Sequence, residues 1–295
     1  MKWVPEIESK DIILAIHGYN DYSNAFDIPG KFLLNHGIKT ISFDLRGFGK
    51  NKDRGEWFVL QYHLDDVLLN LKRIKDKNPN RRIFLLGESM GGAIVISLAE
   101  KYNDLPIDGL ILVAPAIWDF TESNFWKSIT LKFFSTILPN VKVSGKGIIK
   151  VTASDNNEML KRLSKDIHFI DKPSLKSLYG ITNLMNDAFK NALSYLHNPS
   201  YKTLIMVPIR DEIVPRKPLI KIFKNSGIKK NISKMIDLGV YENSYHMILR
   251  DLEGSKIIND IRLWIENKNS IKQNNVFKDS LRKLNNNPYF HRLDK

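Results

Sequence analysis

The chain has 295 residues, no cysteine and a formal net charge of +13 at pH 7. The lack of cysteine excludes disulfides and thiolate chemistry, and the seven scattered histidines show no zinc-binding spacing. The basic residues are accompanied by asparagine and isoleucine throughout the chain, and they form no arginine-rich stripe between aromatic residues. This pattern argues against nucleic-acid binding.

The predicted elements follow one another as alternating strands and helices, which favours one large α/β domain. Residues 1–8 contain neither a long apolar core nor a cleavage pattern, and no later apolar run approaches a membrane-spanning length, so we expect a cytoplasmic protein. Apolar runs predict the strands of a mostly parallel sheet with helices on both faces: residues 12–16, 40–43, 83–86, 110–114, 204–207 and 234–237. Helical spacing of apolar residues predicts helices over residues 63–77, 92–102 and 253–266.

The third predicted strand runs into a Gly-x-Ser-x-Gly pattern centred on Ser89 and then into an apolar helix. A serine at such a turn is held in a strained backbone conformation, and Gly87 and Gly91 let the chain fold back without a Cβ clash. Its hydroxyl then projects above the N-terminus of the helix. A Ser/Gly-rich turn is the alternative interpretation, so the prediction that Ser89 is a nucleophile depends on its partners.

A serine nucleophile needs a base and a carboxylate that orients it, in the chain order Ser, Asp or Glu, His for this architecture. Asp211 lies on the turn after the strand predicted at 204–207, and His246 lies on the loop after the last strand. Both positions follow the carboxyl ends of strands, where the catalytic groups of open α/β sheets gather. Glu212 and Asp237 are rival acids that rank lower, because Glu212 is one residue further along the turn and Asp237 falls within a strand. Taken singly, Asp211 is equally compatible with turn initiation and His246 with a surface loop.

The tetrahedral intermediate of such a reaction also needs two hydrogen-bond donors for its oxyanion. The backbone N–H of Met90, the residue after the serine, is the first candidate. The second is the N–H of Tyr19, in the loop where the first predicted strand ends in His17-Gly18. We interpret His17 as a structural histidine that braces this loop.

These residues, together with the run Asp44-Leu45-Arg46-Gly47-Phe48-Gly49, resemble the α/β-hydrolase superfamily, and within it the monoglyceride lipase and lysophospholipase-like serine hydrolases. The resemblance covers about residues 11–118 and 200–267. It implies that Asp44 and Arg46 shape a loop, and that no cofactor is needed. Glu88 departs from the pattern, because many members have histidine there. About ten residues precede the first strand, too few for the two additional N-terminal strands of many such folds, so we expect a shorter sheet at that edge.

The sheet pattern is interrupted at about residues 119–197, where the resembled family inserts a cap over its pocket. Within this stretch, Trp126, Ile129, Phe133 and Ile137 share one face of a predicted helix. Three interpretations stay open for that face: packing on the core, a roof over an acyl chain, or a lid that touches a membrane.

The chain therefore divides into an expected α/β-hydrolase domain, residues 1–267, and a basic Lys/Asn-rich tail, residues 268–295. The tail suits a short helix with one apolar edge, formed by Val276, Phe277, Leu281 and Leu284. A solvated terminus and a weak anchor to anionic lipid are both compatible with this pattern.

The function implied by the resemblance is a serine esterase that acts on a lipid-like ester of the monoglyceride or lysophospholipid class. The expected partners are a small-molecule ester substrate and, peripherally, an anionic membrane. Acyl transfer or thioester hydrolysis with the same triad, and a catalytically silent binding module, are the alternatives.

Overall fold

The structure is a computed structural model that describes residues 1–4, 9–144, 151–225, 228, 234–268 and 274–286. Its strands form one sheet in the order β1-β3-β2-β4-β5-β6-β7, parallel except for the pairing of β1 with β3. The strands are β1 (Lys2–Trp3), β2 (Asp11–Ile16), β3 (Ile38–Ser42), β4 (Arg82–Glu88), β5 (Gly109–Val113), β6 (Thr203–Pro208) and β7 (Ile236–Tyr241). This confirms the predicted mostly parallel sheet, and β1 adds a short antiparallel strand at the edge expected to be shortened.

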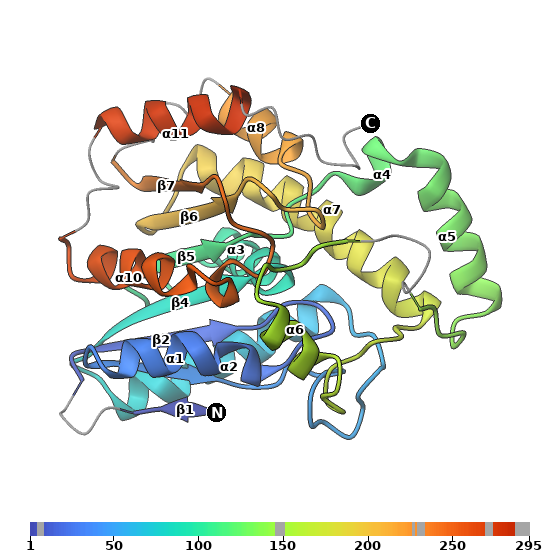
Figure 1. Cartoon of the computed structure of the whole chain (residues 1–295), viewed down its shortest axis with the longest axis horizontal. Helices are drawn as coiled ribbons and strands as arrows, with labels where there is room; N and C mark the ends of the chain where they lie inside the picture. Colours follow the sequence, from blue (N-terminus) through green and yellow to red (C-terminus); the bar gives the residue numbers. More distant parts are fainter. Residues whose placement is uncertain (5–8, 145–150, 226–227, 229–233, 269–273, 287–295) are drawn as a thin grey trace.

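Helices cover both faces of the sheet, as Figure 1 shows. One face packs against α1 (Asp27–Leu34) and α10 (Gly254–Ile265), together with the short 3-10 helices η1 (Ser23–Phe26) and η2 (Ile248–Arg250). The other face packs against α2 (Leu60–Lys77), α3 (Met90–Lys101), α7 (Leu175–His197) and α8 (Lys217–Phe223). Because both faces are covered, every residue of β2, β5 and β6 is buried, which explains their continuous apolar sequences.

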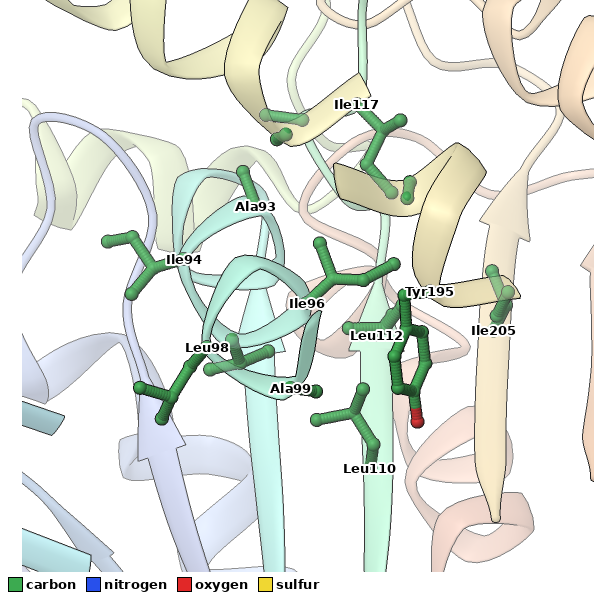
Figure 2. Packing of buried hydrophobic residues seen from close by; sticks show 14 of the residues in the cluster. Ala93, Ile94, Ile96, Leu98, Ala99, Leu110, Leu112, Ile117, Tyr195 and Ile205 are labelled. Atoms are coloured by element: carbon green, nitrogen blue, oxygen red, sulfur yellow. The ribbon is translucent and has the colours of Figure 1, made fainter. Parts of the chain in front are cut away.

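Helix α3 is buried from Met90 to Ala99. It is sandwiched between the sheet and α7: Figure 2 shows Ile96 of α3 near Leu112 of β5 and Tyr195 of α7. A helix enclosed on all sides has little freedom to shift. The N-terminal end of α3 is therefore a rigid platform.

The segment between β5 and β6 contains α4 (Phe120–Ser123), α5 (Phe125–Ile137), α6 (Asn157–Leu163) and α7. Helix α5 packs on α7 and lies far from the sheet (Figure 1). Its apolar side chains point to solvent: Trp126 is 77% exposed and Phe133 is 58% exposed, whereas its buried residues are Ser128 and Ser135. The interpretation of this face as a core-packing face is therefore wrong.

The C-terminal helix α11 (Asn274–Asn286) packs against β7, so this part of the chain adjoins the main fold (Figure 1). Leu284 is fully buried, Leu281 packs on the same core, and Lys283 Nζ lies 2.9 Å from Glu242 Oε1. These two leucines are thus unavailable to a lipid anchor. The side chains of Val276 and Phe277 lie outside the described residues.

Within the described ranges, no helix combines the length and the apolar composition that crossing a bilayer requires.

Candidate active site

Ser89 occupies the turn between β4 and α3 with φ 55° and ψ −116°. A positive φ in a residue other than glycine costs about 1–3 kcal/mol, so the surrounding structure must enforce it. The Ser89 N–H donates to the Val113 carbonyl at 2.9 Å, and the Ser89 carbonyl accepts from the N–H of Ala116 at 2.9 Å. A Cβ on Gly91 would lie 2.1 Å from the Ile16 carbonyl oxygen, so only glycine permits this close approach of α3 to β2.

Three side chains form a continuous hydrogen-bonded chain at the carboxyl ends of the strands. His246 Nε2 lies 2.9 Å from Ser89 Oγ, and His246 Nδ1 lies 2.7 Å from Asp211 Oδ2. The other carboxylate oxygen of Asp211 accepts the backbone N–H groups of Ile213 at 2.8 Å and Val214 at 2.9 Å. His246 and Asp211 are buried, while Ser89 is partly exposed.

The environment of His246 favours its protonated form. Burial alone lowers the pKa of this imidazole, but the carboxylates of Asp211 and Glu88 raise it more, and the net shift is above the ordinary value despite the opposing charge of Arg250. An imidazolium that forms when the serine loses its proton is therefore stabilised.

The two predicted oxyanion donors, Met90 and Tyr19, belong to segments that adjoin Ser89. Met90 is the first residue of α3, so its N–H has no acceptor within the helix, and it lies at the positive end of the helix dipole. Tyr19 follows Gly18, where an added Cβ would lie 3.2 Å from the Ser89 Cβ. The loop after β2 thus runs directly alongside the serine.

His17 is fully buried and connects the loop after β2 to the loop after β3. Its Nε2 accepts the Leu45 N–H at 3.0 Å, which leaves Nδ1 to donate to the Gly18 carbonyl at 2.9 Å. Burial lowers the pKa of His17 and keeps it neutral. These contacts support the interpretation of His17 as a brace.

The loop after β3 is held together by the residues of the Asp-x-Arg-Gly-x-Gly run. Asp44 accepts the backbone N–H groups of Ser23 at 3.0 Å and Lys50 at 2.8 Å. Arg46 donates from Nε to Asp66 of α2 at 2.7 Å. Both side chains shape the loop, as the resemblance implied.

The rival acids have other partners. Asp237 accepts the indole N–H of Trp264 at 2.7 Å from within β7, and Glu212 accepts the backbone N–H of Thr152 at 2.8 Å. Asp211 is the carboxylate that contacts His246.

A buried ionic cluster next to the serine was not predicted from the sequence. Arg250 Nη1 donates to Asp21 Oδ2 at 2.7 Å, and Arg250 Nη2 donates to Glu88 Oε2 at 3.1 Å. The three residues are 6%, 2% and 2% exposed, respectively. Burial raises the pKa of Glu88, and the charge of Arg250 opposes that rise. The available signals were a carboxylate directly before the serine and an arginine four residues after the histidine.

The segment before α6 is tied to the histidine loop. The Ala153 carbonyl accepts the Met247 N–H at 2.8 Å, and Ser154 Oγ donates to Asp251 Oδ1 at 2.6 Å. Asp251 Oδ2 in turn accepts the N–H of Tyr245, the residue before His246. Part of the segment inserted between β5 and β6 therefore holds the loop that carries the base.

No group of three or more His, Asp or Glu side chains with metal-binding geometry occurs among the residues that the structure describes.

The chain as a whole resembles known proteins. The profile of the family described as "Serine aminopeptidase, S33" (Hydrolase_4) matches residues 7–253. Monoglyceride lipase of Mus musculus is 25% identical over 274 residues, covering 90% of this chain and 86% of that protein. A phospholipase of Bacillus subtilis is 23% identical over 256 residues, covering 86% of this chain and 95% of that protein.

Solved structures share the fold. The monoacylglycerol lipase of Paleococcus ferrophilus superposes with a TM-score of 0.73 at 21% identity, covering 91% of this chain and 98% of that one. A soluble variant of the monoglyceride lipase of Saccharomyces cerevisiae gives a TM-score of 0.74 at 19% identity, covering 92% and 91%.

Proposed function

Since the chain belongs to the Hydrolase_4 family of α/β-hydrolases, we propose that it is a serine esterase that cleaves lipid-like carboxylic esters of the monoglyceride or lysophospholipid class. One observation carries the proposal: the unbroken hydrogen-bonded chain from Ser89 through His246 to Asp211. A histidine of a surface loop or an aspartate that only initiates a turn would have no reason to form this chain of hydrogen bonds with the serine.

The reaction follows from this geometry. His246 Nε2 takes the proton of Ser89 as the hydroxyl attacks the ester carbonyl, and Asp211 orients the imidazole and stabilises its charge. The N–H groups of Tyr19 and Met90 receive the oxyanion of the tetrahedral intermediate, each contributing about 3 kcal/mol when preorganised. The imidazolium then protonates the leaving alcohol, and water activated by His246 hydrolyses the acyl-enzyme.

The surface of α5 supports a lipid-like substrate. Its exposed apolar residues, with Trp126 and Phe133 the most prominent, are beside Lys127 and Lys132 on the same helix. An apolar face flanked by lysines suits contact with an anionic membrane, at which a lipid ester would be encountered. The outward direction of this face favours the membrane-touching lid over the roof of an acyl pocket.

Acyl transfer to an alcohol and thioester hydrolysis use the same acyl-enzyme, so they are tested by adding an alcohol acceptor or a thioester to the same assay. A silent binding module would leave Ser89 unreactive.

The test is labelling of the purified protein with a fluorophosphonate probe, followed by hydrolysis assays over a chain-length series of glycerol and p-nitrophenyl esters. We expect labelling and turnover to be lost in Ser89→Ala and kept in Ser123→Ala, a control at an exposed serine of α4. Hydrolysis by Ser89→Ala at the wild-type rate would refute the proposal.

A further inference from the structure

A single side chain connects three of the segments that build the proposed site. Arg250 lies four residues after His246, in η2. Its guanidinium binds Asp21, two residues after Tyr19 in the loop that follows β2, and Glu88, the residue directly before Ser89. The base, the nucleophile and one oxyanion donor are therefore each within a few residues of the same cation.

The burial of this cluster makes its geometry hard to change. All three side chains are almost inaccessible to water, so separating one partner leaves an uncompensated charge in the interior. Such buried ionic groups add little to net stability, because the cost of desolvation offsets their attraction, but separating the partners is costly, so arrangements that pull these segments apart are disfavoured. The pair geometry is directional as well, because each carboxylate meets a different terminal nitrogen of the planar guanidinium.

The loop after β2 is held on its outer side by Tyr19, whose hydroxyl lies 2.9 Å from Ser177 Oγ, and by Asn20, whose carbonyl accepts the N–H of Ile170 at 2.9 Å. Its contacts toward the serine are different ones. Gly18 approaches Ser89 without a side chain, and His17 fixes the start of the loop through Leu45. Beyond Tyr19, Asp21 is the residue that ties the loop to the elbow and to the histidine loop at once. An error of about 1 Å in the placement of a catalytic group can cost on the order of 10²-fold in rate.

We propose that Arg250 is a positioning residue. Through Asp21 it holds the loop after β2, and through Glu88 it holds the turn that carries Ser89, in the positions relative to the His246 loop that the transition state requires. It touches none of the reacting atoms. The inference rests on the proposed esterase function, and it predicts a loss in kcat with little change in KM, because the substrate is bound equally well in the ground state.

The experiment measures kcat, KM and thermal unfolding of three variants with p-nitrophenyl butyrate, with active sites counted by fluorophosphonate titration. Arg250→Met removes the charge and keeps an unbranched side chain. Arg250→Lys keeps the charge but loses the planar guanidinium, whose two terminal nitrogens bind Asp21 and Glu88. Arg82→Met is the matched control: Arg82 forms a two-point ion pair with Asp11 at the opposite ends of the strands, at 2.7 and 2.9 Å.

We expect Arg250→Met to lower kcat per titrated site on the order of 10²-fold with KM within about 3-fold, and Arg250→Lys to recover part of that loss. Arg82→Met should keep the wild-type kcat. A wild-type kcat per titrated site in Arg250→Met, with or without a lower melting temperature, would overturn the proposal and leave a purely structural ion pair.

Should Arg250→Met fail to fold, the isosteric Asp21→Asn variant decides. It removes the charge that links Arg250 to the oxyanion loop, while the amide oxygen can still accept the N–H of Tyr22. We expect a fall in kcat on the order of 10-fold, and a wild-type kcat overturns the proposal. Failure of the esterase function itself is distinguishable, because the wild-type protein would then hydrolyse no ester and Ser89→Ala would change nothing.

Discussion

Replacing Asp211 by asparagine tests the proposed triad most directly, because the structure dictates how the amide must be oriented. Asp211 Oδ1 accepts two backbone N–H groups, from Ile213 and Val214, and Oδ2 faces His246 Nδ1. In Asp211→Asn, the amide oxygen has to take the place of Oδ1, because an NH₂ group there would meet two donors. The amide NH₂ then points at His246.

A donor at this position reverses the tautomer of the imidazole. His246 Nδ1 must accept the amide hydrogen, so Nε2 carries the ring proton and faces Ser89 Oγ as a donor. The imidazole is then unable to take the proton of the serine. We expect kcat to fall on the order of 10⁴-fold, which corresponds to about 5 kcal/mol of transition-state stabilisation.

The assay is hydrolysis of p-nitrophenyl butyrate by folded protein, with Glu212→Gln and Asp237→Asn as controls at the two rival acids. Both controls should keep kcat within a few-fold, since Glu212 binds the N–H of Thr152 and Asp237 binds the indole of Trp264. An Asp211→Asn variant within tenfold of wild type, or a large loss in either control, would refute the assignment of the acid.

Three further outcomes follow from the structure. His246 acts as a base only when it is neutral, and its pKa is raised, so kcat/KM should increase with pH at values above the ordinary pKa of histidine. Glu88→Gln removes a carboxylate that raises this pKa and should move the increase to lower pH. An increase that stays at the same pH would contradict an effect of Glu88 on the pKa of His246. Leu284→Ala should lower the free energy of unfolding in urea by about 2–5 kcal/mol while kcat at 25 °C stays unchanged, and a change below about 0.5 kcal/mol would mean that α11 does not pack on β7 as described. The double change Trp126→Ser and Phe133→Ser should weaken sedimentation with anionic phospholipid vesicles and slow hydrolysis of long-chain monoglycerides, with p-nitrophenyl acetate hydrolysis as the control; equal losses on both esters would count against lipid contact.

The sequence predicted those features that depend on neighbouring residues. The six apolar runs all form strands, although the last begins at Ile236, two residues later than expected, and continues to Tyr241. The strand, glycine and helix pattern around Ser89 is local, and it predicted a turn that the structure shows with a positive φ. Asp211 and His246 could be placed because both follow a predicted strand.

Features created by distant contacts could not be predicted in this way. Helix α1 contains Pro29 and Gly30, which break a helical pattern, and Gly30 is explained by Trp3, whose ring an added Cβ would meet at 2.4 Å. The burial of Leu284 depends on its contact with the core, although the composition around it is polar. The cluster of Arg250 with Asp21 and Glu88 joins residues 229 and 162 positions apart, and no pattern of spacing contains that information.

These long separations also determine when the site comes into existence as the chain is made. Ser89 and His246 are 157 positions apart, and bringing them together costs chain entropy before their contacts can offset that cost. Synthesis delivers the serine and the loop after β2 first, and the histidine with its neighbouring arginine last. A ribosome-bound chain that ends before His246 carries a serine hydroxyl without a base. Hydrolysis therefore begins only once β6, β7 and the residues that follow them have joined the sheet.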